Sequence, residues 1–223
     1  MPALNELAAI GELIIGIRRA SNLPIWVIDD CSADATSERA SSLGAKAIRL
    51  SEQLGAWGAV QTGLREAARM NLDFVVTMDA DGQHDPSNIP DLIGPVINRE
   101  AEVVIGCYPD RGSKLRRLAW SLMRLTSGLV MADPTSGYRV LNKRAVRLLS
   151  SPAASQLEFQ DVGVLLMLEQ AQFRIQEQPV TMKQRSNGKS RIFRSWALVA
   201  HYMAQTLLLG AAKRRKSPRH KPL

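Results

Sequence analysis

Short apolar runs along the chain alternate with longer segments in which apolar residues recur every three or four positions. The apolar runs predict strands at residues 25–28, 45–50, 74–78 and 102–106. The helical spacing predicts helices at residues 5–21, 32–40, 57–70 and 88–98, the first of them capped by Asn5. Repeated strand and helix predict an α/β fold whose mostly parallel sheet carries helices on both faces.

The second half of the chain alternates less regularly. We expect helices at residues 114–130, 143–149 and 162–170, an extended segment at 136–141 and a strand at 173–180, followed by a polar loop at 183–190. These elements continue a single domain that ends near residue 191.

The apolar run at residues 74–78 stops at two aspartates, Asp79 and Asp81, that are separated by one residue. In open α/β sheets, ligands bind at the carboxyl ends of the strands. Two carboxylates this close repel each other unless a cation lies between them, and Mg²⁺ or Mn²⁺ prefers oxygen ligands and can share them with a diphosphate. The alternative is a strand that ends in an ordinary polar turn.

Four further motifs place polar residues where ligands of such a sheet would bind. They are Pro2-Ala3-Leu4-Asn5-Glu6, Asp29-Asp30-Cys31-Ser32, Asp133-Pro134-Thr135-Ser136-Gly137-Tyr138-Arg139 and Arg185-Ser186-Asn187-Gly188-Lys189-Ser190. Together with Asp79-Ala80-Asp81 they form five ordered motifs, and in this order the chain resembles family 2 glycosyltransferases of the dolichyl-phosphate-mannose-synthase-like, or polyprenyl-phosphate, branch.

The resemblance implies a Rossmann-like nucleotide-sugar-binding domain of the glycosyltransferase A type. It further implies an inverting enzyme that moves a sugar from a nucleotide-diphosphate-sugar to a polyprenyl phosphate, with Mg or Mn as cofactor. By resemblance, the donor-binding residues are Pro2, Leu4, Glu6, Asp29, Asp30, Asp79, Ala80, Asp81, Gln83 and His84, with the metal on Asp79 and Asp81. The acceptor phosphate would contact Arg139, Arg185, Lys189 and Ser190, and the catalytic set would be Asp79, Asp81, Asp133, Arg139 and Asp161.

Several of these residues have a structural alternative. Asp29 and Asp30 could cap the next helix, His84 could orient a carboxylate, and Arg139 could form an ion pair with Asp133. Arg185 and Lys189 could belong to an ordinary solvated loop.

Asp161 has a role that depends on the acceptor. A hydroxyl acceptor needs a base, whereas a phosphate acceptor is already ionised. With a phosphate acceptor, Asp161 would position the acceptor or cap the following helix.

The sequence departs from the resembled family at three places. The strand that usually precedes the Pro-Ala motif is lacking, because the sequence begins at Met1. Gly55-Ala56-Trp57-Gly58 lacks the lysine of a Gly-Lys-Gly run, and Cys107-Tyr108 replaces a Ser-Arg pair. The missing strand leaves a non-catalytic nucleotide-sugar-binding protein as one alternative, and a soluble transferase acting on a sugar hydroxyl as another.

The charge of the chain is concentrated at its end. The net charge is +8, and residues 213–223 carry six of the 29 Lys and Arg residues, which leaves 23 basic against 21 acidic residues elsewhere. A nearly neutral body speaks against nucleic-acid binding, whereas a basic tail favours an anionic membrane surface.

The tail follows residues 192–212, an amphipathic segment that we expect to lie in the membrane interface, the alternative being a core or oligomer helix. No signal peptide or membrane-spanning run is evident, and the two cysteines show no metal-ligand spacing. We therefore expect a cytoplasmic protein that is peripheral on the inner face of the cell membrane.

Overall fold

The computed structural model describes residues 1–108, 131–157 and 162–183. The chain divides into two compact units, of which the first comprises Met1–Tyr108 and Thr135–Asn187. The second comprises Pro109–Pro134 and Gly188–Leu223, and only residues 131–134 of it are described. The account below therefore concerns the first unit, except where Asp133 is named.

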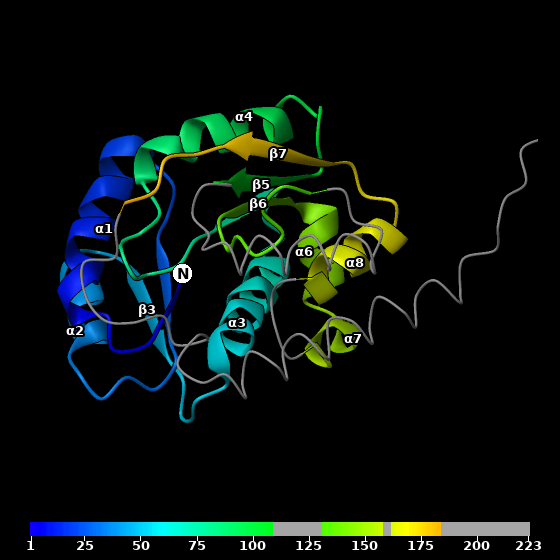
Figure 1. Cartoon of the computed structure of the whole chain (residues 1–223). Coiled ribbons are helices and arrows are strands. Elements are labelled where there is room, and N and C mark those ends of the chain that lie inside the picture. Colours follow the sequence, from blue (N-terminus) through cyan, green and yellow to red (C-terminus); the bar gives the residue numbers. More distant parts are fainter. Residues whose placement is uncertain (109–130, 158–161, 184–223) are drawn as a thin grey trace, which may run out of the picture. The chain divides into compact units, whose positions relative to one another are not determined.

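The strands of the first unit form two sheets (Figure 1). The first sheet has the order β1-β2-β3, and all its strands are parallel. The second has the order β4-β6-β5-β7, in which β6 runs antiparallel to both β4 and β5, and β7 is parallel to β5. The strands are β1 (Pro2–Ala3), β2 (Trp26–Asp29), β3 (Lys46–Arg49), β4 (Phe74–Thr77), β5 (Val103–Cys107), β6 (Arg139–Asn142) and β7 (Ile175–Pro179).

Helices cover both faces of these sheets. On one face, α1 packs against α2 and α4, and its apolar stripe contributes Ile10, Leu13 and Ile14 to a core shared by residues of both sheets. On the other face, α3 contacts β1, β2 and β4, and α6 contacts β4 and β6. The helices are α1 (Leu7–Ala20), α2 (Thr36–Ser42), α3 (Gly55–Arg69), the 3₁₀ turn η1 (Pro86–Asn88), α4 (Ile89–Ile97), α6 (Lys143–Leu149), α7 (Pro152–Ser155) and α8 (Val162–Gln170).

The expected α/β fold is confirmed: the pairing is parallel throughout the first sheet and mixed in the second. Periodicity located the elements but not the direction of β6, because the pairing partner of a strand is a long-range property. Pro2 and Ala3 of the Pro-Ala motif form the two-residue strand β1, which is paired with Ile28 and Asp29 of β2.

The expected cap of α1 is wrong. Asn5 has a φ of 53° and lies outside the helix, and the N-cap position belongs to Glu6, which makes no side-chain capping bond. The helix amides at Ala9 and Ile10 are bonded instead to the backbone carbonyl of Glu6.

None of the helices in the described ranges is both long and apolar enough to span a lipid bilayer. The expected helices at residues 114–130 and 192–212 and the basic tail lie outside the described residues.

Candidate active site

The two aspartates of the Asp79-Ala80-Asp81 motif follow β4 and face the surface. Side chains alternate between the two sides of an extended chain, and here Met78 and Ala80 are buried while Asp79 and Asp81 remain half-exposed. The alternation therefore presents two carboxylates on the outer side of the same short segment.

The position of Asp79 is fixed by a loop residue and by a glycine. Its amide donates to Nδ1 of His84 at 3.1 Å, and Nε2 of the same ring lies 4.0 Å from Oδ2 of Asp79. A Cβ atom on Gly137 would lie 2.9 Å from Oδ1 and 3.0 Å from Oδ2 of Asp79, closer than such contacts normally allow. Glycine at 137 thus leaves the space that the Asp79 carboxylate occupies.

The imidazole ring of His84 packs against the ring of Tyr138. The two rings stack with their centroids 4.9 Å apart, and the Tyr138 hydroxyl donates to the Asp85 carbonyl at 3.1 Å. Both side chains are buried, and burial together with the charge of Asp85 raises the pKa of Tyr138. Tyr138 is therefore a neutral hydrogen-bond donor at all physiological pH values. Its bond to the Asp85 carbonyl stabilises the loop that carries His84.

The aspartates after β2 are buried and bonded to protein groups. Asp29 accepts from the Ser32 amide at 2.8 Å and from the Ser37 hydroxyl. Burial raises its pKa, but these bonds and the charge of Arg49 outweigh burial and hold the pKa below its usual value. Asp29 is therefore ionised and stabilises the turn that leads into α2.

Asp30 serves a different helix. Its carboxylate accepts from the amides of Leu54 at 2.6 Å and Gly55 at 3.0 Å, where α3 begins. A carboxylate at this point satisfies amides that lack helical partners and interacts favourably with the helix dipole. The capping role was anticipated for the next helix along the chain, but Asp30 acts on the one after it.

The loop after β1 is joined to the loop after β2. The Asn5 amide donates to Ser32 Oγ at 2.9 Å, and Asn5 Oδ1 accepts from the Ala33 amide at 2.7 Å. The Glu6 amide donates to Thr36 Oγ1 at 3.0 Å. These bonds bring the first two motifs together. Glu6 is half-exposed, whereas Asp29 and Asp30 are buried.

The loop after β4 is joined to the segment that precedes residues 184–190. Asp81 Oδ1 accepts from the Gln83 amide at 3.0 Å, and the Gln83 carbonyl accepts from the Lys183 amide at 2.8 Å. A bridge between His84 and Met182 adds to this contact. The chain therefore enters the expected phosphate loop directly beside the two aspartates.

Arg139 is buried at the start of β6, opposite Thr77 of β4. Its Nε donates to the Ser136 carbonyl at 2.7 Å, so the guanidinium supports the turn that carries Gly137. Asp133 is fully buried as well, but it belongs to the second compact unit. Asp161, Arg185, Lys189 and Ser190 lie outside the described residues.

The side chains at this site supply only some of the ligands that a hard divalent cation needs. Within residues 1–108, 131–157 and 162–183, no cluster of three or more His, Cys, Asp or Glu side chains is arranged to hold a metal. The half-exposed carboxylates of Asp79 and Asp81 nevertheless supply the oxygen donors that Mg²⁺ and Mn²⁺ prefer, and such ions commonly take further ligands from a substrate phosphate. The pair therefore fits a metal that the substrate helps to bind.

Two residues of this site, Gly137 and Tyr138, were not assigned a role from the sequence, and Asn5 was expected only to cap α1. Asn5, Gly137 and Tyr138 occur inside the quoted motifs, but their functions depend on contacts between loops that are far apart in the chain. The run Ser136-Gly137-Tyr138 inside the fourth motif was the available signal for Gly137, and nothing local indicated that Asn5 would join two loops.

Comparison with known families gives one match over most of the chain. The sequence model described as Glycosyl transferase family 2 matches residues 1–151. This range includes the loops after β1, β2 and β4 and the turn at Gly137.

Curated relatives are similar over most of their length. A UDP-N-acetylglucosamine–dolichyl-phosphate N-acetylglucosaminyltransferase from Methanococcus voltae is 26% identical over 81% of this chain and 82% of the relative. An undecaprenyl-phosphate mannosyltransferase from Micrococcus luteus is 27% identical over 96% and 93%. A dolichol-phosphate mannosyltransferase from Pyrococcus furiosus is 29% identical over 86% of this chain and 58% of the relative.

Solved structures share the fold. Glucosyl-3-phosphoglycerate synthase from Mycobacterium tuberculosis, solved with Mn²⁺, UDP-glucose and phosphoglyceric acid, superimposes with a TM-score of 0.68 at 23% identity, covering 98% of this chain and 79% of the other. The same enzyme with phosphoglyceric acid alone gives a TM-score of 0.72 at 22% identity, covering 98% and 79%. At this identity the likeness establishes the fold alone.

Proposed function

Because the chain belongs to glycosyl transferase family 2 and is a glycosyltransferase that uses a nucleotide sugar, we propose that it transfers the sugar to a polyprenyl phosphate with inversion at the anomeric carbon. The observation that carries the proposal is the pair of half-exposed carboxylates after β4, beside which the chain enters the loop of Arg185 and Lys189.

The acceptor class is supported by the relatives. Three of them, from Methanococcus voltae, Micrococcus luteus and Pyrococcus furiosus, carry names that specify a polyprenyl or dolichyl phosphate acceptor. Each match covers at least 81% of this chain, so the likeness is not confined to residues 1–151.

In this proposal Asp79 and Asp81 hold Mg²⁺ or Mn²⁺ at the diphosphate of the donor. When bound, such an ion neutralises the charge that develops on the leaving diphosphate. The contribution of the protein is to orient the carboxylates: Gly137 leaves room for Asp79, and the Gln83 amide bonds to Asp81.

The nucleoside end of the donor is assigned to the joined loops after β1 and β2. Glu6 is half-exposed and has surface available for the base or ribose, together with the neighbouring Leu4. Asp29 and Asp30 are at most 3% exposed, so in this proposal they shape the pocket from beneath through their bonds to the α2 and α3 starts.

The acceptor phosphate is assigned to Arg139, which lies opposite Thr77 at the carboxyl end of β4, and to three residues of the sequence that follows Lys183. Arg139 supplies a guanidinium suited to phosphate, and Arg185, Lys189 and Ser190 belong to the loop that follows Lys183. A phosphate oxygen is already ionised and attacks the anomeric carbon from the side opposite the leaving diphosphate, so Asp161 need not act as a base.

A lipid acceptor also implies contact with a membrane surface. We propose that residues 192–212 and the basic residues 213–223 bring the enzyme to an anionic membrane at the cytoplasmic face. Co-sedimentation with anionic vesicles tests this: truncation after residue 212 should weaken binding in a salt-dependent way, whereas Trp196→Glu should weaken binding at both low and high salt. Unchanged binding of Trp196→Glu would refute the interfacial segment.

Turnover with a defined acceptor tests the reaction itself. The purified chain is supplied with UDP- and GDP-sugars, Mn²⁺, and either undecaprenyl phosphate or a sugar acceptor with free hydroxyls. We expect product with the lipid phosphate and an anomeric configuration opposite to that of the donor, determined by NMR. Transfer only to the hydroxyl acceptor would overturn the proposal. It would show a soluble transferase that acts on a sugar hydroxyl instead.

A further inference from the structure

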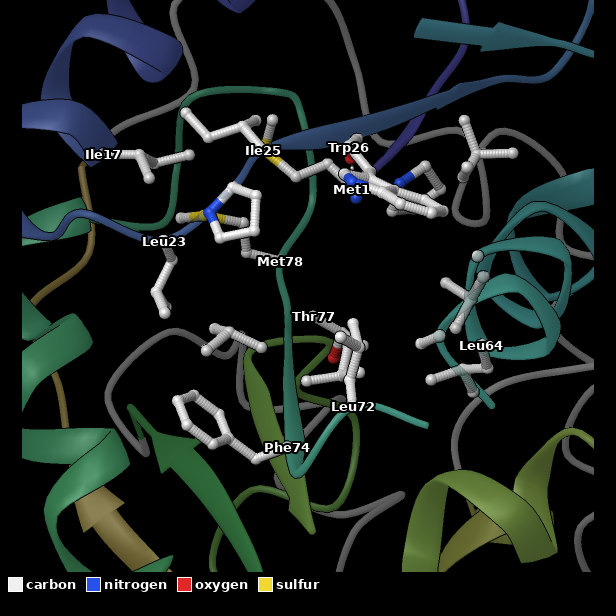
Figure 2. Close-up of a pocket in the computed structure, with 18 of the residues that line it drawn as sticks. Met1, Ile17, Leu23, Ile25, Trp26, Leu64, Leu72, Phe74, Thr77 and Met78 are labelled. Atoms are coloured by element: carbon white, nitrogen blue, oxygen red, sulfur yellow. Dashed lines mark hydrogen bonds between the residues drawn. The ribbon is translucent and has the colours of Figure 1, made fainter. Parts of the chain in front are cut away.

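The segment that carries Asp79 and Asp81 is supported by a neighbouring strand on one side. Among the described residues, strand β4 pairs with β6 alone. On its other side Thr77 and Met78, the two residues before Asp79, border an apolar cavity between β2 and β4 (Figure 2). The direction of the two carboxylates therefore depends on the loop that follows them, residues 82–88, and on the contacts that hold this loop.

Residues 181–183, which follow β7, run antiparallel to this loop. The Lys183 amide donates to the Gln83 carbonyl at 2.8 Å, and the Gln83 amide donates to Asp81 Oδ1 at 3.0 Å. The backbone of Gln83 therefore links the Asp81 carboxylate to residues 181–183. A shift of this segment would move the amide that orients Asp81.

The other end of this contact is made by the side chain of Asn88. Its Oδ1 accepts from the Thr181 amide at 3.3 Å, and its Nδ2 donates to the Thr181 carbonyl at 3.3 Å and to the Thr181 hydroxyl at 3.1 Å. A side-chain amide that exchanges both bonds with one residue imitates a hydrogen-bonded pair in antiparallel strands. Nδ2 also donates to the Asp85 carbonyl at 3.0 Å, which joins the side chain to its own loop.

Asn88 occupies a position at which asparagine normally has another role. It is the N-cap residue of α4, where an asparagine side chain usually accepts from an amide of the first helical turn. Here the side chain makes no capping bond. It contacts instead a residue 93 positions further along the chain. This use indicates a role for Asn88 outside its own helix.

We propose that Asn88 is a positioning residue of the metal site. By holding residues 181–183 against the loop after β4, it fixes the Gln83 backbone and, through it, the direction of the Asp81 carboxylate. Asn88 acts through these groups and not by contact with the metal. The inference rests on the metal role of Asp79 and Asp81 in the proposed function, and it is independent of the acceptor.

The same contacts imply that metal binding affects residues 181–183. Coupling between two sites is reciprocal, so an ion that orders the Asp81 carboxylate and the Gln83 amide also stabilises the bond from Lys183. Hydrogen exchange at the Lys183 amide should therefore become slower when Mn²⁺ and a nucleotide are bound.

The test compares Asn88→Ala with Asn98→Ala in the full chain. Asn98 is the exposed C-cap residue of the same helix, and its side-chain amide bonds to Glu100, two residues away. Mn²⁺ binding is measured by electron paramagnetic resonance with UDP or GDP present, and nucleotide binding by calorimetry in EDTA. Hydrogen exchange, with and without Mn²⁺ and nucleotide, is followed by NMR at three amides, those of Gln83, Thr181 and Lys183.

We expect Asn88→Ala to speed metal-free exchange at the three amides by at least about tenfold. Mn²⁺ binding should weaken about three- to tenfold, the effect of losing one or two net hydrogen bonds. Nucleotide affinity in EDTA should stay within about twofold, a separation that a general distortion of the fold would not produce. Asn98→Ala should match the parent in every measurement.

Three results would overturn this inference alone. They are metal-free exchange at Gln83 that Asn88→Ala leaves unchanged, exchange at Lys183 in the parent that Mn²⁺ and nucleotide leave unchanged, and Mn²⁺ affinity that is lost in Asp81→Ala but equal in Asn88→Ala and the parent. A parent chain that binds no Mn²⁺ with either nucleotide would remove the metal role of Asp79 and Asp81, and this inference with it.

Discussion

The amide of Asp79 donates to Nδ1 of His84, five residues further along the chain, at 3.1 Å. A nitrogen that accepts a hydrogen bond carries no proton, so the proton of the neutral ring is on Nε2. That nitrogen lies 4.0 Å from Asp79 Oδ2. One histidine thus fixes the backbone of Asp79 and directs an N–H group toward its carboxylate.

The carboxylates of Asp79 and Asp81 are expected to be essential for turnover but not for folding. Asp79→Ala and Asp81→Ala should each reduce activity by at least about 100-fold, because each removes an oxygen donor for the metal while relieving repulsion between the pair. Turnover is measured across a Mn²⁺ titration, and the thermal midpoint in parallel. Asp73→Asn, an exposed change before β4, serves as the control. Activity that resists both substitutions, or that is indifferent to chelation, would exclude the metal role.

Gly137 is expected to control the position of Asp79. Gly137→Ala places a methyl group about 3 Å from both oxygens of that carboxylate, so the carboxylate must move. We expect a loss of about 10- to 100-fold in Mn²⁺ affinity or in activity, as for other residues that orient metal ligands. Gly94→Ala is the matched control, since a Cβ there meets no atom within 4 Å. Equal Mn²⁺ dependence of the Gly137 variant and the parent would contradict this role.

Asp30 is expected to stabilise the fold through α3. Asp30→Asn keeps one oxygen acceptor but turns an amide group toward the second donor, and it removes the charge at the helix start. We expect a loss of about 1–2 kcal/mol in the free energy of unfolding, measured by urea denaturation. Glu52→Gln, an exposed neighbour, should change it by less than about 0.5 kcal/mol. Equal stability of the two variants would show that the bonds to Leu54 and Gly55 contribute little.

The buried Met1 amino group predicts that stability rises between pH 6 and pH 8. Its pKa falls from 8.0 to about 6 on folding, so between these values the unfolded chain binds more protons than the folded one. Below pH 6 both states are protonated and the folded state bears the full penalty of about 3 kcal/mol; above pH 8 the penalty vanishes. Urea denaturation at several pH values measures the slope.

The control for this slope is the amino-acetylated chain, which has no group to titrate at this position. Mass spectrometry first establishes that Met1 is retained. A slope that is the same with and without the acetyl group would assign the effect to other groups, such as the three histidines.

Arg185 and Lys189 are expected to act on the acceptor. Arg185→Ala and Lys189→Ala should raise the KM for lipid phosphate while leaving nucleotide affinity within about twofold, because removing a contact to one substrate weakens binding of that substrate. Kinetics against lipid phosphate and calorimetric titration of the nucleotide separate the two effects. Equal losses in both measurements would show that this loop also binds the nucleotide-sugar donor.

The sequence predicted the elements of the first unit more accurately than their contacts. Helical spacing located α1, α3 and α6 to within a few residues because each buries one continuous stripe. It could not show that β6 runs antiparallel between β4 and β5, nor that Asn5 would bond to Ala33 instead of capping α1. Both depend on groups that are distant in the chain.

In the candidate site, too, the sequence predicted the residues with a local signal and missed the roles that depend on distant contacts. Asp79 and Asp81 were recognised because an apolar run stops at them, which is a local signal. The roles of Gly137 and Asp30 were not recognised, because a close approach to Asp79 and a bond to the start of α3 are visible only in three dimensions.

The placement of β6 between β4 and β5 also determines the order in which the chain can fold during synthesis. Strands β4 and β5 are complete once residue 107 has left the ribosome, but they are not neighbours and cannot pair with each other. They acquire a shared partner only when residues 139–142 emerge, and β5 gains its second neighbour with residues 175–179. The nascent chain therefore carries two apolar strands with open edges through about a third of its translation, the interval in which chaperones would protect it from aggregation.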